Sequence, residues 1–216
     1  MKDLLHQINI YTHILFGTIS MILGLWPIVS KKGNSIHKKT GKWYLRTLTI
    51  VIVTALLGGL FFNYRPFLVL LSILVFYQAF AGTRTLKLKH KRPEILDNTL
   101  VGLGIILALF YIVYFDFDKA SMSRPVVLST VIALLINLCY DLGKNLYPGT
   151  YLGSAWIYDH IVRMLSSYGG LIMAFTGNVL NPAFQPWSQL LPSVISYSLI
   201  IYFVLRQAIL TKRKSP

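Results

Sequence analysis

The chain has few charged residues and almost no cysteine for its length of 216 residues. Only 13% of the residues are Asp, Glu, Lys or Arg, whereas 55% are hydrophobic and the mean hydropathy is +0.59. A water-soluble domain of this length could not bury so large an apolar fraction, so the composition excludes that class. The single Cys139 lies within an apolar segment, which excludes a disulfide framework and a thiolate metal site.

Long stretches of alternating polarity are also missing, which argues against a transmembrane barrel. The apolar residues instead gather in windows of roughly 18 to 22 residues, the length of helix that crosses about 30 Å of hydrocarbon. The sequence therefore predicts an all-α, polytopic transmembrane helix bundle that forms one integral membrane domain. The seven predicted spans cover residues 8–29, 43–62, 66–83, 98–115, 125–141, 160–180 and 190–210.

Acidic residues are scarce, because seven Asp and Glu stand against 21 Lys and Arg and give a formal net charge of +14. Such a charge can indicate nucleic-acid binding, so its placement has to be considered. With the N-terminus outside, 17 of the 21 basic residues fall on the inner side, and only Lys2, Arg65, Lys119 and Arg124 fall outside. This distribution follows the positive-inside rule. It predicts an N-terminus outside, a C-terminus inside, membrane lipids including anionic inner-leaflet lipids as partners, and no nucleic acid.

Recognisable catalytic motifs are missing as well. The sequence contains no HExxH, CxxC, P-loop or GxSxG pattern, so no motif indicates a soluble-enzyme mechanism. Residues 1–30 lack a small-x-small cleavage site and lead directly into a lysine-rich loop. We therefore expect this segment to form the first span rather than a signal peptide.

Polar residues do occur at the predicted inner ends of the spans. They are His37 before the second span, Arg84 closing the third, Asp97 opening the fourth, and Asp159, His160 and Arg163 opening the sixth. Ionisable groups at the edge of the hydrocarbon are costly unless they are paired, hydrated or able to reach the headgroups. We expect one polar site at the cytoplasmic ends of the second, third and sixth helices.

Simpler roles for four of these residues stay open. Asp159 and Asp97 are each placed to cap the N-terminus of a helix by accepting hydrogen bonds from free backbone N–H groups. Arg84 and Arg163 are each placed to reach the phosphates of inner-leaflet lipids. Under these alternatives the residues anchor helices and form no common site.

His37 and His160 have no evident capping role, and both belong to the inner side. A neutral imidazole can ligate zinc or haem iron, and a neighbouring carboxylate can fix its tautomer. The two residues are therefore candidate ligands of a metal ion or haem. The alternative is that they are hydrogen-bonded structural groups or proton carriers.

His13 lies about one and a half turns inside the outer half of the first helix. An ionisable group within the membrane is a functional candidate by default. The alternative is a hydrogen bond to a facing polar side chain, for which Gln78 and Asn137 are candidates. His13 shares one helix face with Gly17, Ser20 and Gly24, and this face is expected to contact other helices.

The run "HILFGTISMILGLWPIVSKKGNSIHKKTGKWY", residues 13–44, combines a His, helix glycines, Lys-Gly and then His-x-x-x-Gly-x-x-Tyr. Together with "FAGTRTLKLK" (80–89) and "DHIVRMLSSY" (159–168), it resembles a family of bacterial multi-pass membrane proteins, the domain of unknown function 2306 and its relatives. The resemblance implies a polytopic protein of the bacterial inner membrane and brings no reaction, substrate or cofactor. The matching residues are His13, Gly17, Gly24, Lys32, Gly33, His37, Gly41, Tyr44, Arg84, His160 and Arg163.

Three classes of function follow from these patterns. The first is a membrane protein of unknown activity whose inner polar site, with His37, Arg84, Asp159, His160 and Arg163, binds a lipid headgroup, a small ligand or a partner. The second is a membrane redox protein with haem, metal or quinone. The third is a small-solute or proton transporter that uses His13. The sequence lacks an inverted repeat and a pair of broken helices, which argues against the third class.

Overall fold

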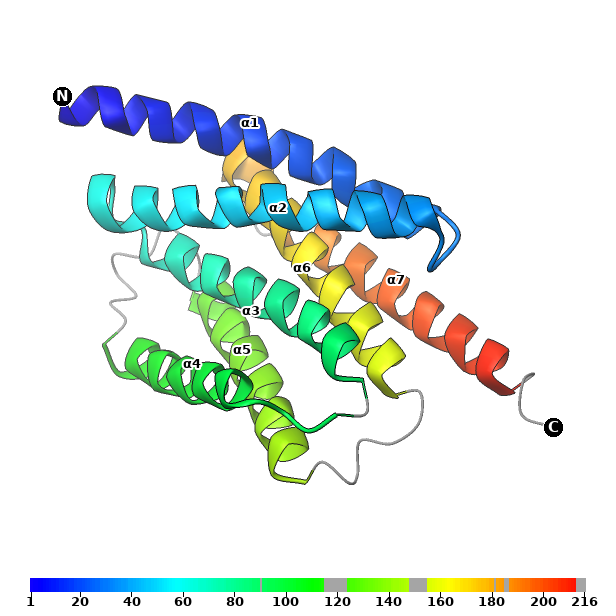
Figure 1. Ribbon diagram of the computed structural model, residues 1–216. Coiled ribbons are helices and arrows are strands. Elements are labelled where there is room, and N and C mark those ends of the chain that lie inside the picture. Colours follow the sequence, from blue (N-terminus) through cyan, green and yellow to red (C-terminus); the bar gives the residue numbers. More distant parts are fainter. Residues whose placement is uncertain (90, 115–123, 148–154, 181, 185–186, 213–216) are drawn as a thin grey trace.

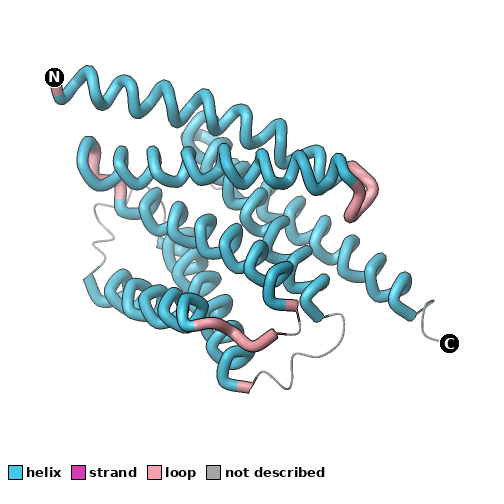
Figure 2. The backbone as a smooth tube through the Cα atoms, in the orientation of Figure 1, coloured by secondary structure: helices cyan, strands magenta, loops and turns pink. Residues whose placement is uncertain are grey.

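The computed structural model describes residues 1–89, 91–114, 124–147, 155–180, 182–184 and 187–212 (Figure 1). These residues form helices and connecting loops, with no strand among them (Figure 2). The long helices are α1 (Lys2–Val29), α2 (Ser35–Leu57), α3 (Pro66–Leu88), α4 (Ile95–Tyr114), α5 (Arg124–Leu146), α6 (Ala155–Val179) and α7 (Trp187–Lys212). A short π-helical segment, Gly58–Phe62, continues α2, and a 3-10 turn, Pro182–Phe184, precedes α7. The all-α prediction is confirmed.

Six of the described helices are long and apolar enough to cross a membrane, and α6 is the helix that does not qualify. The sequence predicted seven spans, of which the sixth covered residues 160–180. The helix is present, but Asp159, His160 and Arg163 lower the apolar character of its first turns. These polar groups are tolerated because α6 lies among α3, α7 and α1, so that its polar face meets protein instead of lipid.

The helices are arranged around α3 and α6. Helices α1 and α2 pack along each other as a hairpin, α2 also packs on α3, and α6 lies between α3 and α7 (Figure 1). Helices α4 and α5 form a second hairpin that attaches to this group through contacts of α5 with α3. The end of α3 and the start of α6 therefore adjoin the end of α5, and this places their polar residues together.

Small residues bring several helices into close contact. A Cβ atom on Gly24 of α1 would lie 2.5 Å from the ring of Tyr168 on α6, and one on Gly82 of α3 would lie 3.1 Å from Cβ of Arg163. In a membrane such close approach replaces the hydrophobic driving force as a source of attraction between helices. The predicted contact face of α1 is confirmed at Ser20 and Gly24, which are buried. Gly17 makes no such close contact, because nothing lies within 4 Å of its Cβ position.

Candidate functional site

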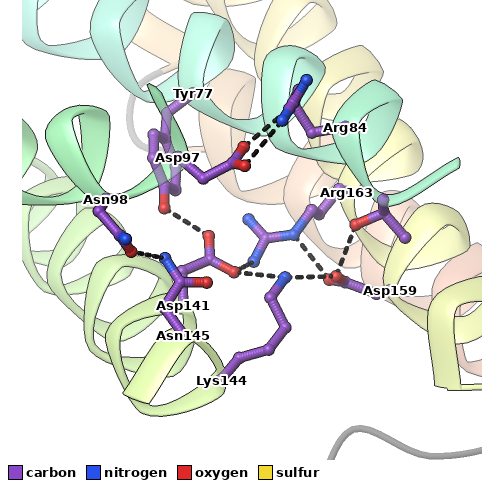
Figure 3. Close-up of polar contacts among 10 residues, drawn as sticks. Tyr77, Arg84, Asp97, Asn98, Asp141, Lys144, Asn145, Asp159 and Arg163 are labelled. Carbon is purple, nitrogen blue, oxygen red and sulfur yellow. Dashed lines mark hydrogen bonds and ion pairs between the residues drawn. The ribbon is translucent and has the colours of Figure 1, made fainter. Parts of the chain in front are cut away.

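A buried network of charges joins α6 to α5 (Figure 3). The Arg163 side chain is 1% exposed, its Nε donates to Oδ1 of Asp159 at 2.6 Å, and its Nη2 donates to Oδ1 of Asp141 at 2.7 Å. The rings of Tyr77 and Tyr140 lie 5.8 and 5.7 Å from the guanidinium carbon. Removing a guanidinium from water is costly, and these anionic and aromatic partners offset that cost.

Lys144 of α5 ties the same two carboxylates together. Its Nζ lies 2.8 Å from Oδ1 of Asp141 and 3.1 Å from Oδ2 of Asp159. The one remaining oxygen, Oδ2 of Asp141, accepts from Tyr77, and Oδ2 of Asp159 also accepts from Thr85 at 2.8 Å. Two carboxylates balance two cations, so the network carries no net charge and its anions are fully occupied.

A second polar contact fixes the α4–α5 hairpin to α3. Arg84 donates to both oxygens of Asp97 at 2.7 Å, and its Nη2 also contacts Glu94 at 2.8 Å. Paired parallel hydrogen bonds of this kind are among the strongest that proteins form. Beside this contact lies a cavity of about 30 Å³ that Tyr77 and Lys144 also line, which is room for one water molecule.

These contacts correct three sequence predictions. Asp159 does not cap α6, which begins at Ala155; the carboxylate is buried and ion-paired instead. Arg84 and Arg163 direct donors at internal carboxylates, and Arg163 is enclosed, which argues against lipid phosphates as their partners. Asp97 does assist the start of α4, since its Oδ2 accepts from the backbone N–H of Glu94 at 2.8 Å. It does so from within the first turn, as the acidic partner of a capping box does.

His37 and His160 are held in the same way as each other. Nδ1 of His37 lies 3.1 Å from the carbonyl oxygen of Pro27, and Nδ1 of His160 lies 2.9 Å from that of Gly82. A carbonyl can only accept, so Nδ1 carries the proton in both rings. Among the described residues neither Nε2 atom has a hydrogen-bond partner. The two rings lie near enough for the charge of a protonated His160 ring to act on His37, and a shared functional site for them stays a prediction.

Further cations surround these histidines. Nζ of Lys32 donates to the carbonyl oxygens of Pro27 at 2.7 Å and Ile28 at 2.5 Å, and it lies 4.2 Å from the ring centre of Phe203 on α7. Lys32 and His37 therefore share the carbonyl of Pro27. The charge of Arg206 on α7 acts on Lys32, and that of Lys38 acts on His37. We call these groups the cation set, which consists of Lys32, His37, Lys38, His160 and Arg206.

The cation set differs from the buried network in having no paired anions. Within the described residues none of its five members forms an ion pair with a carboxylate. Asp159 precedes His160 in the chain, but its oxygens are occupied by Arg163, Lys144 and Thr85. Partial burial and the nearby charge of Arg206 lower the pKa of Lys32 to about 8. Among the described residues, Lys32, Lys38 and Arg206 thus concentrate positive charge without an ion-paired carboxylate, although the charge of Asp159 acts on His160.

His13 lies apart from both groups. Its Nδ1 is 2.9 Å from the Thr54 hydroxyl and 3.2 Å from the carbonyl oxygen of Val51, both on α2. The alternative of a hydrogen bond to a facing polar side chain is confirmed. The suggested partners Gln78 and Asn137 were wrong, because α1 packs on α2 and not on the helices that carry them.

The six predicted site residues thus divide into four places. His37 and His160 belong to the cation set, Asp159 and Arg163 to the buried network, Arg84 to its pair with Asp97, and His13 to the α1–α2 contact. Sequence reasoning missed Tyr77, Asp141 and Lys144, although a charge at the end of the predicted fifth span was a visible signal. It also missed Lys32 and Arg206 as site residues, because they did not stand out among the other inner basic residues.

A set of three or more His, Cys, Asp or Glu suited to a metal ion does not occur among the described residues. Any metal or haem would depend on the two imidazoles of the cation set. No protein-family model, curated protein or solved structure matches this chain. The resemblance to the domain of unknown function 2306 therefore stays a prediction, and the fold and the site define only a helical membrane-protein class.

Proposed function

We propose that this protein binds an anionic, phosphate-bearing ligand at the cation set, with a lipid headgroup as the first source of that phosphate. The observation that carries the proposal is the contrast between the two polar groups. The buried network neutralises Arg163 and Lys144 with two carboxylates, whereas Lys32 and Arg206 form no ion pair with a carboxylate of the described residues. Arg163 and Lys144 are thus neutralised within the fold, whereas the cation set can bind an anion from outside the protein.

The chemistry of the cation set suits a phosphate. Arg206 offers several N–H donors, and Lys32 has one N–H left beyond its two carbonyl contacts. Nε2 of His37 and of His160 becomes a donor when the ring is protonated. His37 also lies in the first turn of α2, where the helix dipole favours negative charge. With both rings protonated, a phosphate placed there would receive charge-assisted hydrogen bonds from α2, α6 and α7.

The proposal includes an orientation in the membrane. The excess of basic residues at the ends that carry the cation set supports an N-terminus outside and a C-terminus inside. The resemblance adds the inner membrane of a bacterium, where the cytoplasmic leaflet supplies anionic lipids. A reporter fused after residue 216 should be active only in the cytoplasm. Activity on the outer side would contradict this orientation.

Lipid selectivity tests the proposed function. The protein is reconstituted in vesicles of equal parts phosphatidylglycerol and phosphatidylcholine, and the lipids that it retains are measured by native mass spectrometry. We expect at least a fivefold preference for phosphatidylglycerol in the wild type. The double variant Lys32→Gln, Arg206→Gln should lose this preference, because its two strongest donors to phosphate are gone.

The matched control is the double variant Lys39→Gln, Lys42→Gln. Both lysines are exposed on α2 near the cation set but are not part of it, so the net charge falls equally. This control should keep the wild-type preference. If both double variants lose it to the same degree, general surface charge and not a site explains the selectivity, and the proposal fails.

One observation favours a second candidate, in which the protein binds a metal ion or haem. Both His37 and His160 direct Nδ1–H at a backbone carbonyl, which is how metal-bound histidines are usually oriented. Elemental analysis and visible absorbance of the purified protein test this candidate against a His37→Ala, His160→Ala variant. Near-stoichiometric iron or zinc that disappears in the variant would favour it over phosphate binding. The transporter class stays a prediction, because no described contact of His13 extends beyond α2.

A further inference from the structure

An apolar furrow runs between α6 and α7 and has a volume of about 290 Å³. Among the described residues, no charged side chain lines it. Its lining residues are Tyr168, Ile172, Thr176 and Leu180 on the α6 side, and Trp187, Ser188, Leu191, Pro192, Ile195, Ser196 and Leu199 on α7. Its length and apolar lining fit a hydrocarbon chain better than a polar solute.

Two features of the sequence hold the furrow in shape. Pro192 has no N–H, so it leaves the carbonyl of Ser188 without its helical donor. The Thr176 hydroxyl of α6 donates to this carbonyl at 2.5 Å. Further along, a Cβ on Gly169 would lie 2.3 Å from Oγ of Ser196, so the Ser196 side chain packs directly against the backbone of α6. Helices α6 and α7 are thus in close contact at two points, and the furrow lies along this contact.

The furrow ends at Leu199, and the cation set lies further along the same face of α7. Arg206, Phe203 and Leu199 follow one another at intervals of three and four residues, which places them on the same side of a helix. Lys32 lies over the ring of Phe203, and Leu199 is the first residue of the furrow on α7. At the opposite end, around Trp187, the lining carries no charge. Charge complementarity therefore places an anionic headgroup at the Arg206 end.

The length of this path limits the ligand. Leu199 lies about 10 Å from Arg206 along the axis of α7, and Trp187 lies about 28 Å from it, at ~1.5 Å per residue. The hydrocarbon core is about 30 Å thick, so one leaflet accounts for about 15 Å. An ordinary acyl chain with its headgroup at Arg206 would end near Ser196. A chain that fills the furrow to Trp187 must cross the midplane.

We infer that the ligand is a lipid phosphate whose hydrocarbon chain is longer than one leaflet, as in the polyprenyl phosphates. Its phosphate lies at the cation set and its chain lies in the furrow between α6 and α7. This inference rests on the proposed phosphate site and adds the class of lipid that occupies it.

Photo-crosslinking in bilayer nanodiscs tests the inference on the full chain. The probe is a polyprenyl phosphate with a diazirine at the end of its chain, and the labelled peptides are identified by mass spectrometry. The expected label lies near Leu180, Trp187 and Leu191, at the far end of the furrow. A phosphatidylcholine with a diazirine at the end of an ordinary acyl chain should label these positions at least fivefold less.

Two isoleucines of α7 provide matched variants. Ile195 lines the furrow and Ile201 does not, yet both are 59% exposed. Ile195→Trp should fill the furrow and lower the label at its far end at least fivefold, whereas Ile201→Trp should leave it unchanged. Equal labelling of the two variants, or equal labelling by the phosphatidylcholine probe, overturns the furrow as the chain site.

The same experiment separates this inference from the proposed function. Lys32→Gln, Arg206→Gln should lower the polyprenyl label at least fivefold, and the Lys39→Gln, Lys42→Gln control should not. If the cation-set variant loses phosphatidylglycerol selectivity but the far end of the furrow is never labelled, the phosphate site stands and the long-chain inference fails. If excess inorganic phosphate abolishes retention of every lipid while the furrow variants have no effect, the ligand is free phosphate and the inference fails.

Discussion

Arg163 of α6 and Asp141 of α5 form a buried ion pair, with Nη2 donating to Oδ1 at 2.7 Å. The pair fastens the α4–α5 hairpin to the helices around α3 and α6, because direct packing of that hairpin on α3 and α6 is limited. Buried ion pairs contribute little net stability over an apolar pair, but they strongly disfavour the loss of one partner. The network thus specifies where the hairpin docks.

Removal of the guanidinium should therefore destabilise the fold. Arg163→Met leaves Asp141 and Asp159 close together with only Lys144 to balance them, and we expect a loss of about 3 to 5 kcal/mol in the free energy of unfolding. Arg206→Met, at an exposed position, should change it by less than about 0.5 kcal/mol. Equilibrium unfolding in mixed micelles of SDS measures both. Equal effects would show that the ion pair does not dock the hairpin.

Substitution by alanine is expected to have opposite effects on stability at two glycines of α1. A Cβ on Gly24 would meet the Tyr168 ring at 2.5 Å and the Tyr44 ring at 2.9 Å, whereas one on Gly17 meets nothing within 4 Å. Gly24→Ala should cost about 1 to 3 kcal/mol, because the packed rings have to move. Gly17→Ala should be neutral or stabilising by up to about 1 kcal/mol. The reverse order would contradict the packing of α1 on α6.

The Thr176 hydroxyl is expected to hold the end of the furrow near Trp187. Thr176→Val leaves the carbonyl of Ser188 without a donor and should cost about 1 to 3 kcal/mol. Thr18→Val is the control, since the Thr18 hydroxyl bonds only within its own helix, to Ile14, and is exposed. Unfolding measurements on the two variants compare them directly. If the Thr176→Val protein is as stable as the Thr18→Val control, the hydrogen bond from Thr176 to Ser188 does not hold α6 and α7 together.

The cation set predicts a pH dependence through Lys32. Its pKa of about 8 lies below the ordinary 10.5, since burial and Arg206 disfavour the ammonium, and its other polar neighbours are His37 and the carbonyls of Pro27 and Ile28. The ligand-free fold therefore gains stability from this group as the pH rises from about 8 towards 10.5, because the unfolded chain holds the proton more tightly.

Binding should respond in the opposite direction. The charge of phosphatidylglycerol does not change between pH 7.5 and 9.5, so loss of the Lys32 proton should lower its affinity about threefold or more over that range. In Lys32→Gln most of this decrease should disappear. A decrease of the same size in the variant would assign the pH dependence to another group.

The sequence predicts the fold better than the site. Hydropathy predicted seven helices at nearly the observed positions, because the length of a span and its apolar character are local properties of the chain. The orientation read from the basic residues stays a prediction. Pairing is not local. Arg84 and Arg163 looked like lipid anchors because Asp97 and Asp141 become their partners only when α4 and α5 dock. The histidines were identified, but the cations that accompany them were not.

The most direct test of the cation set is the affinity for one short-chain anionic lipid. Dioctanoyl phosphatidylglycerol is titrated into the purified protein at pH 7 and followed by tryptophan fluorescence. We predict a dissociation constant at least tenfold higher for Lys32→Gln, Arg206→Gln than for the wild type, and a change of less than twofold for Lys39→Gln, Lys42→Gln. Equal affinities in all three proteins would contradict the account.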